Sequence, residues 1–261
     1  MKRLTIILVL LTTAVAPLAA RGEKQTVQYA VKGGKALYLD HYVSDKAEGS
    51  RPCVIFVFGG GFAGGVRDAG KYQSYFDMLT ESGYDVVSID YRLGLKDFDS
   101  DEAGLVETIR TMKNSVEYAV EDLLSATRFI LDNAGEWNID PRKIVVSGSS
   151  AGAITALQAE NSICNRSDAA KIVPPEFNYA GVIAFAGAVF STGGRPEWET
   201  PPCPTLFFHG NSDRNVPYEK AAVLGIGFYG PKILVEQFDE MARPTTSTRR
   251  YTVRTSWQRS R

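Results

Sequence analysis

The chain has 261 residues, of which 44% are hydrophobic and 23% are charged, the balance of an ordinary globular protein. Its formal net charge is −1 and no long run of one sign occurs, so neither a nucleic-acid partner nor an anionic membrane surface is indicated. The length suits one large α/β domain or two small ones.

The first twenty residues differ in composition from the rest. Two basic residues precede an apolar run over residues 4–11, and small residues end at Ala19 and Ala20. This pattern is typical of a secretory signal peptide, and the run is shorter than the ~20 apolar residues that a membrane span needs. We predict a signal peptide over residues 1–20 and export to the periplasm or the extracellular space, with no stable membrane anchor.

A β-hairpin is expected at the start of the mature domain, with strands over 27–31 and 36–43. The apolar run CVIFVF, residues 53–58, suits a strand that is buried on both faces. A helix over 70–82 that stops at Gly83 and a strand over 85–91 come next. Hydrophobic residues then recur at steps of three and four through residues 104–134, which predicts a long amphipathic helix.

The second half continues the alternation of strands and helices. Strands are expected over 143–147, 180–189 and 204–208, and helices over 151–161, 218–228 and 231–241. This order predicts a mainly parallel twisted sheet with helices on both faces. No internal repeat or linker-like tract interrupts it, so we expect one α/β domain over residues 21–240.

Three cysteines remain in the chain, Cys53, Cys164 and Cys203. Cys53 lies in the apolar strand pattern, where a buried and inert thiol is expected. A disulfide between Cys164 and Cys203 is open to an exported protein, but their spacing does not show it. No cysteine or histidine cluster has the spacing of metal ligands, so no metal site is predicted.

A candidate nucleophile lies in VSGSSAGA, residues 146–153. Gly148-x-Ser150-x-Gly152 follows an apolar strand and precedes a helix, the setting of a serine on a sharp strand-to-helix turn. The alternative is a pair of helix-capping serines. The context favours Ser150 as the nucleophile over Ser149, which lacks the flanking glycines.

Three glycines follow the buried strand in Phe58-Gly-Gly-Gly-Phe62. Glycines leave backbone N–H groups unshielded, and two such donors can hold the oxyanion of a tetrahedral intermediate. We predict Gly60 and Gly61 as donors, together with Ala151 directly after the nucleophile. The alternative is a flexible glycine loop.

A candidate acid lies in His209-Gly-Asn-Ser-Asp213, after the strand PTLFF and hence at the carboxyl end of the sheet, where ligands of α/β proteins bind. A carboxylate there can orient a histidine and stabilise its charged form. An aspartate that only stabilises a turn is the alternative. His209 itself is expected to fix this loop, because it lies close to Asp213 in the sequence; the alternative is that it serves as the base.

Taken together, the three segments resemble the α/β-hydrolase superfamily, in the esterase and lipase branch with a glycine-rich oxyanion loop. The resemblance covers about residues 25–240 and rests on FGGGF (58–62), DYRL (90–93), FILDNAGEWNIDPRKIVVSGSSAGA (129–153) and HGNSDRNVP (209–217). It implies a serine carboxylic-ester hydrolase with a triad in the order Ser-Asp-His, acting on small-molecule esters without a metal or organic cofactor. The nucleophile carries over to Ser150 and the acid to Asp213.

The chain departs from this family at its end. The family has a last strand, the catalytic histidine and a final helix after the acid, but no histidine follows His209, and His41 lies in the N-terminal hairpin. We therefore expect the final strand and helix to be missing, the activity to be impaired and the stability to be reduced.

The last segment, residues 241–261, has six arginines, five threonines, three serines and no acidic residue. One interpretation is a basic disordered tail. The other is a shift of the reading frame near residue 241, because the codons of residues 251–252, read one nucleotide earlier, allow histidine followed by glycine.

Two other functions remain open for the chain. One is a non-catalytic binding protein that keeps the hydrolase scaffold, and the other is a peptidase of the same fold. Aromatic residues near the predicted site can line an acyl or aryl pocket: Phe58, Phe62, Tyr91 and Trp198. For Phe58, packing in the core is the alternative.

Overall fold

The structure is a computed structural model that describes residues 24–46, 49–99, 102–242 and 252–254. The predicted signal peptide lies outside the described residues, as does most of the predicted basic tail. Within the described part, no helix has the length and hydrophobicity that crossing a membrane requires.

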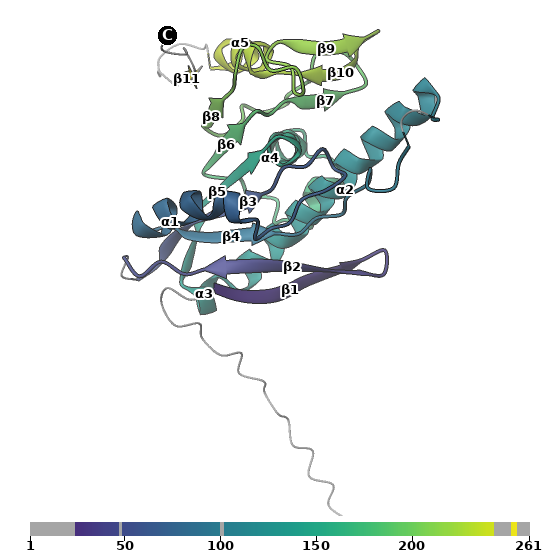
Figure 1. Cartoon of the computed structure of the whole chain (residues 1–261). Coiled ribbons are helices and arrows are strands. Elements are labelled where there is room, and N and C mark those ends of the chain that lie inside the picture. The colour runs from purple at the N-terminus through teal and green to yellow at the C-terminus, as the bar shows by residue number, and fades with distance from the viewer. Residues whose placement is uncertain (1–23, 47–48, 100–101, 243–251, 255–261) are drawn as a thin grey trace, which may run out of the picture.

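The main sheet has eight strands in the order β1-β2-β4-β3-β5-β6-β8-β11 (Figure 1). β1 pairs antiparallel with β2 and β2 with β4, and all the other neighbours pair in parallel. This confirms the mainly parallel sheet that the sequence predicts. The strands are β1 Lys24–Lys32, β2 Lys35–Tyr42, β3 Arg51–Val57, β4 Asp85–Ile89, β5 Ile139–Ser149, β6 Gly181–Phe185, β8 Thr205–Phe208 and β11 Thr252–Arg254.

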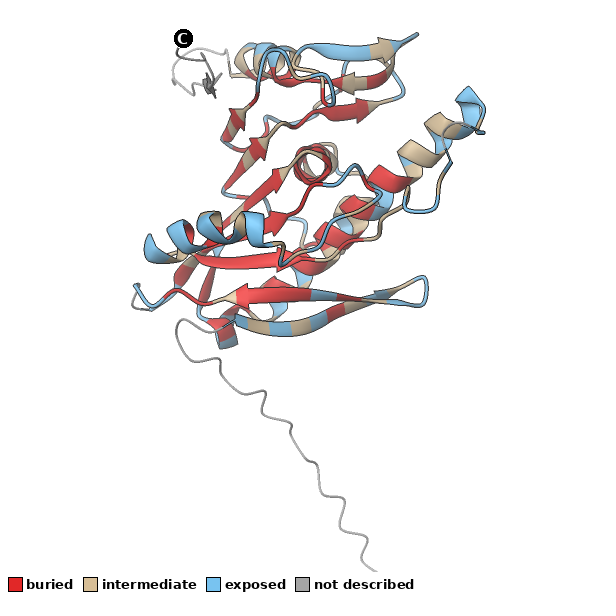
Figure 2. Ribbon diagram, in the orientation of Figure 1, coloured by how far each residue is buried: buried red, intermediate tan, exposed pale blue. Residues whose placement is uncertain are grey.

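Helices cover both faces of this sheet. On one face α1 packs on β3 and β5, where Tyr75 contacts Phe56 and the hydroxyl of Ser147. On the other face lie α2 and α4, so the middle strands are buried on both sides (Figure 2). The helices are α1 Gln73–Glu81, α2 Leu105–Asp132, α3 Ala134–Trp137, α4 Ala151–Cys164 and α5 Pro231–Met241, with short 3-10 helices η1 Gly70–Tyr72 and η2 Ala169–Ile172.

The DYRL segment fixes the loop after β4 to α2. The Arg92 guanidinium donates to both carboxylate oxygens of the buried Asp122 and to Glu121, and the Arg92 N–H also donates to Asp122. Tyr91, directly before it, points into the core and is 1% exposed. This motif therefore joins the carboxyl end of β4 to the long helix.

Two predicted elements are wrong, and both lie beside a small second sheet. The predicted strand 180–189 is divided into β6 and β7 Val189–Ser191, and the predicted helix 218–228 is a hairpin of β9 Lys220–Val223 and β10 Ile226–Tyr229. The three short strands pair antiparallel in the order β7-β10-β9. Leu224 and Gly225 have φ of 50° and 84°, the left-handed values of a tight hairpin turn, so strand pairing and turn geometry override the helical pattern.

The expected absence of a final strand also needs correction. β11 follows α5 and pairs in parallel with β8, with Val253 opposite Phe207. The outer edge of β8 offers unpaired backbone groups, and Thr252 and Val253 are residues that favour strands. The final helix of the family would follow residue 254, outside the described residues.

All three cysteines are free and buried, so the structure contains no disulfide between Cys164 and Cys203. Cys164 Sγ lies 3.5 Å from Oε1 of Glu160, and the Cys203 N–H donates to the same oxygen at 2.6 Å. Burial raises the pKa of Cys53, and it raises the pKa of Cys164 to about 12. Both thiols therefore stay protonated at neutral pH, and the prediction of an inert Cys53 agrees with this.

Candidate active site

Ser150 lies where β5 ends and α4 begins, on the strand-to-helix turn that the sequence predicts. Its backbone has φ of 52° and ψ of −120°, a strained conformation for a residue with a side chain. The Ser150 N–H donates to the Phe185 carbonyl at 2.8 Å, and the Ser150 carbonyl accepts from Ile154 at 2.9 Å. These two bonds to β6 and to the first turn of α4 hold the strained residue in place.

Gly148 and Gly152 are required at this turn because other backbone passes directly against them. A Cβ on Gly148 would overlap the carbonyl group of Gly152. A Cβ on Gly152 would overlap the carbonyl of Val57 and would lie 2.6 Å from the Phe58 carbonyl oxygen. The start of α4 thus packs against the end of β3, which explains the G-x-S-x-G spacing in steric terms.

The glycine loop after β3 lies next to Ser150. A Cβ on Gly59 would be 2.6 Å from the Ser149 carbonyl oxygen and 3.2 Å from the Ser150 Cβ. Gly60 and Gly61 follow with φ of 152° and 63°, which favour glycine, and both are exposed. The loop that the sequence assigned to the oxyanion is therefore beside the assigned nucleophile.

The backbone groups of this loop are used unequally. The Gly59 N–H donates to the Tyr72 hydroxyl at 3.0 Å, and the Gly60 carbonyl accepts from Ala63 and Gly64 at 3.0 Å. Within the described residues, the N–H groups of Gly60 and Gly61 donate no hydrogen bond. They are open to a ligand, as is expected of the N–H of Ala151 in the first turn of α4.

Asp213 lies on the loop after β8, close to His209. Its Oδ1 accepts the N–H groups of Asn215 at 2.8 Å and Val216 at 3.1 Å, which is the turn-stabilising role that the sequence left open. Its Oδ2 lies 3.7 Å from Nε2 of His209, and its side chain is 21% exposed. One oxygen thus orders the loop, and the other remains at the rim of the site.

His209 is held inside the protein by the same loop. It is 2% exposed, and its Nε2 lies 3.0 Å from the Val216 carbonyl oxygen, so the ring fixes the loop as the sequence predicted. Among the described residues no hydrogen bond joins His209 to Ser150.

The other histidine, His41, lies at the far edge of the sheet. Its Nε2 is 2.8 Å from the Asp85 carboxylate, at the amino end of β4, whereas Ser150 and Asp213 follow the carboxyl ends of β5 and β8. Parallel strands place their carboxyl ends along one edge, so His41 and Ser150 are on opposite edges. Among the described residues, His41 is bonded to Asp85 and His209 to the Val216 carbonyl, and no hydrogen bond joins either of them to Ser150.

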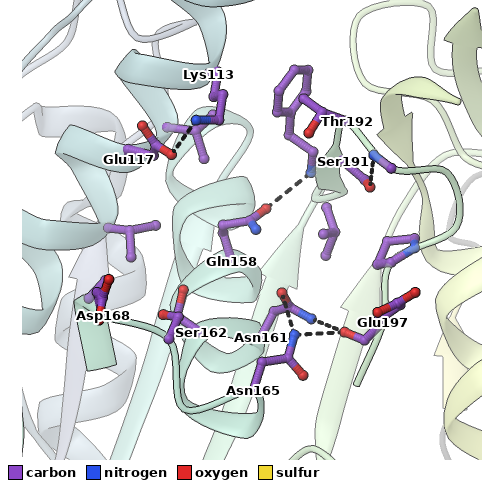
Figure 3. Close-up of a pocket in the computed structure, with 18 of the residues that line it drawn as sticks. Lys113, Glu117, Gln158, Asn161, Ser162, Asn165, Asp168, Ser191, Thr192 and Glu197 are labelled. Carbon is purple, nitrogen blue, oxygen red and sulfur yellow. Dashed lines mark hydrogen bonds and ion pairs between the residues drawn. The ribbon is translucent and has the colours of Figure 1, made fainter. Parts of the chain in front are cut away.

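One cavity lies along α4, away from the Ser150 turn. It has a volume of about 570 Å³ and lies between α2, α4 and the segment after β7 (Figure 3). Gln158 lines it, eight residues along α4 from Ser150, which is ~12 Å at 1.5 Å per residue. Neither Ser150 nor Asp213 is among the residues that line it.

The aromatic residues near the site belong to the core. Phe58, Phe62 and Tyr91 are each at most 2% exposed, and the rings of Phe58 and Tyr91 lie 4.5 Å apart. Trp198 packs on Phe238 of α5, with ring centroids 4.9 Å apart. For Phe58 the structure supports core packing, the alternative that the sequence left open. Phe62 and Tyr91 pack in the core as well, and Trp198 packs against it.

The parallel sheet, the strained Ser150 and the glycine loop beside it define an α/β-hydrolase of the esterase and lipase type. The chain belongs to the BD-FAE family, whose model matches residues 39–189, more than half of its length. The apo form of esterase 2 from Thermogutta terrifontis shares the fold, with a TM-score of 0.63 and 21% identity, over 91% of this chain and 84% of that one.

Curated relatives match shorter parts of the chain. Fumonisin B1 esterase of Sphingopyxis macrogoltabida is 33% identical over 118 residues, which cover 45% of this chain and 21% of that protein. Gut esterase 1 of Caenorhabditis briggsae is 33% identical over 126 residues, covering 48% and 21%. The chain thus spans about a fifth of the length of these relatives.

Proposed function

We propose that this protein is a serine carboxylic-ester hydrolase that acts on small esters through an acyl-enzyme. The observation that carries the proposal is the contact between the strained Ser150 turn and the glycine loop at Gly59, which brings a nucleophile and unpaired N–H donors together. Similar proteins named as esterases support the reaction class.

In this mechanism the Ser150 hydroxyl attacks the ester carbonyl. The N–H groups of Gly60, Gly61 and Ala151 hold the oxyanion, and the positive end of α4 favours its charge. The alcohol leaves with a proton, and water then hydrolyses the acyl group from Ser150. The Ser150 proton passes to solvent and the leaving alcohol takes its proton from solvent, because no side chain of the described residues is bonded to Ser150 as a base. The proposal includes no metal or organic cofactor.

The proton transfers are the weak step of this chain. Asp213 has an oxygen available to orient an imidazole, but the chain has two histidines and neither lies at Ser150. A serine without a base is a poor nucleophile. Loss of the general base removes most of the rate of such an enzyme, so we expect slow hydrolysis that depends on Ser150.

The proposal includes export after removal of residues 1–20, which the composition of that segment supports. Small or surface-displayed esters are the proposed substrates, because the chain between β6 and β8 is short and holds no large lid. Comparison of the cytoplasmic and exported fractions by N-terminal sequencing would test export, and retention of Lys2 and Arg3 in the mature protein would contradict it.

The esterase proposal is tested by hydrolysis of p-nitrophenyl butyrate by the wild type, Ser150→Ala and the matched control Ser149→Ala. We expect Ser150→Ala to lose the activity above background and Ser149→Ala to keep it. Equal rates in all three proteins would instead favour the binding protein on a hydrolase scaffold. Cleavage of peptides but not of esters would favour the peptidase.

A further inference from the structure

The peptide unit between Phe58 and Gly59 is bonded on both sides by tyrosine hydroxyls. Tyr91 donates its O–H to the Phe58 carbonyl at 2.9 Å, and the Gly59 N–H donates to the Tyr72 hydroxyl oxygen at 3.0 Å. The carbonyl and the N–H belong to the same peptide plane. Rotation of this plane would therefore break both bonds.

We propose that Tyr72 and Tyr91 are positioning residues that fix this peptide and thereby orient the Gly60 and Gly61 N–H groups toward Ser150. We name this arrangement the tyrosine clamp: Tyr72 and Tyr91 on the Phe58–Gly59 peptide. The inference rests on the proposed function, because the tyrosine clamp matters for catalysis only if the glycine loop holds the oxyanion.

Both tyrosines are themselves held firmly. Tyr91 is 1% exposed and lies against the Phe58 ring, and its burial raises the pKa of its hydroxyl, so the group remains a donor at neutral pH. Tyr72 ends η1, where its ring packs on Phe56 at 4.7 Å and the Lys71 ammonium lies 4.9 Å from the ring centroid. The two hydroxyls come from different segments, one before α1 and one after β4.

The loop needs such support because its next residues are glycines. Gly60 and Gly61 have no side chains that restrict their backbone, both are exposed, and both have positive φ. Oxyanion donors are effective only when they are oriented before the reaction. A fixed Phe58–Gly59 peptide defines the direction in which the chain enters these two residues.

The test measures binding of phenylboronic acid, which needs no general base. The Ser150 oxygen bonds to boron and its proton goes to solvent, which leaves a tetrahedral boronate anion in place of the reaction intermediate. We expect Tyr72→Phe and Tyr91→Phe each to weaken binding by about tenfold, the effect of one hydrogen bond. The matched control is Tyr75→Phe, since the Tyr75 hydroxyl contacts Ser147 at 3.1 Å and its ring also packs on Phe56.

Ser150→Ala separates this inference from the proposed function. Unchanged affinity in Tyr72→Phe and Tyr91→Phe, with loss of binding in Ser150→Ala, would overturn the clamp and leave the nucleophile standing. Equal binding by Ser150→Ala and the wild type would overturn the proposed function instead.

The amide hydrogen-exchange rate of Gly59 tests the clamp without any ligand. We expect exchange about tenfold faster in Tyr72→Phe than in the wild type or in Tyr75→Phe, because the N–H loses its acceptor. An unchanged exchange rate would contradict the clamp. Tyr72 is half-buried, so this variant remains informative even if Tyr91→Phe fails to fold.

Discussion

Each of the two histidines of this chain lies beside an aspartate, and the two pairs lie at opposite edges of the sheet. His41 and Asp85 are 2.8 Å apart and buried, with Arg51 and the Ser44 N–H on the same carboxylate. His209 and Asp213 are 3.7 Å apart, with the His209 ring buried and the Asp213 side chain 21% exposed. The serine beside the first pair, Ser44, donates its hydroxyl to the Thr80 carbonyl at 2.6 Å, and in the second pair the imidazole is bonded to the Val216 carbonyl. Contact between an aspartate and a histidine therefore does not by itself define a catalytic site.

The largest effect on stability is expected at the buried pair. Asp85 accepts two bonds from the Arg51 guanidinium, at 2.7 and 3.1 Å, and removal of one partner of a buried ion pair costs about 3–5 kcal/mol. We expect Asp85→Ala to lower the free energy of unfolding by that amount in urea titration. The matched change Asp213→Ala, on the exposed loop, should cost about 1 kcal/mol or less. Equal losses of unfolding free energy in the two variants would contradict the larger contribution assigned to the buried pair.

A smaller loss is expected from a change at the nucleophile turn. In Gly152→Ala the new methyl group overlaps the Val57 carbonyl, and overpacking of this kind costs about 1–3 kcal/mol. Gly135→Ala in α3 is the control, because its methyl group would meet no atom within 4 Å. Urea unfolding of both variants checks this, and a stable Gly152→Ala protein would contradict the close packing of α4 on β3.

Two parts of this site could be predicted from the sequence, because each depends on residues that are close together in the chain. The Ser150 turn needs glycines at two fixed positions, and the Asp213 loop needs a strand before it, so both leave a recognisable pattern. The hairpin at residues 220–229 was not predicted, because it is completed by the pairing of β10 with β7, which joins residues 36 to 40 positions apart in the sequence. The tyrosine clamp was missed for a similar reason. Tyr91 lies in the DYRL motif and Tyr72 in no motif, and only the folded chain brings both hydroxyls to the Phe58–Gly59 peptide.

We expect the stability of the protein to depend on acid pH through Asp85, at the amino end of β4. Burial alone would raise the pKa of Asp85, but the hydrogen bonds from His41 and Arg51 outweigh it and hold the pKa below its usual value. A carboxyl with a lowered pKa contributes its full stability above the unfolded value of ~3.9 and loses it as the pH falls through the folded pKa. Melting temperatures should therefore fall below about pH 4 in the wild type and fall less in Asp85→Asn. Parallel pH profiles for the two proteins would contradict this assignment.

The most direct test of the account is the rate of p-nitrophenyl acetate hydrolysis by Asp213→Asn, relative to the wild type and Ser150→Ala. In an intact triad, replacing the aspartate costs ~10⁴-fold because the histidine loses its orientation. In this chain Asp213 has no catalytic histidine to orient, so we predict a Ser150-dependent rate within about threefold of the wild type. A loss of several orders of magnitude in Asp213→Asn would contradict the account, because it would show that a histidine of this chain serves Ser150 after all.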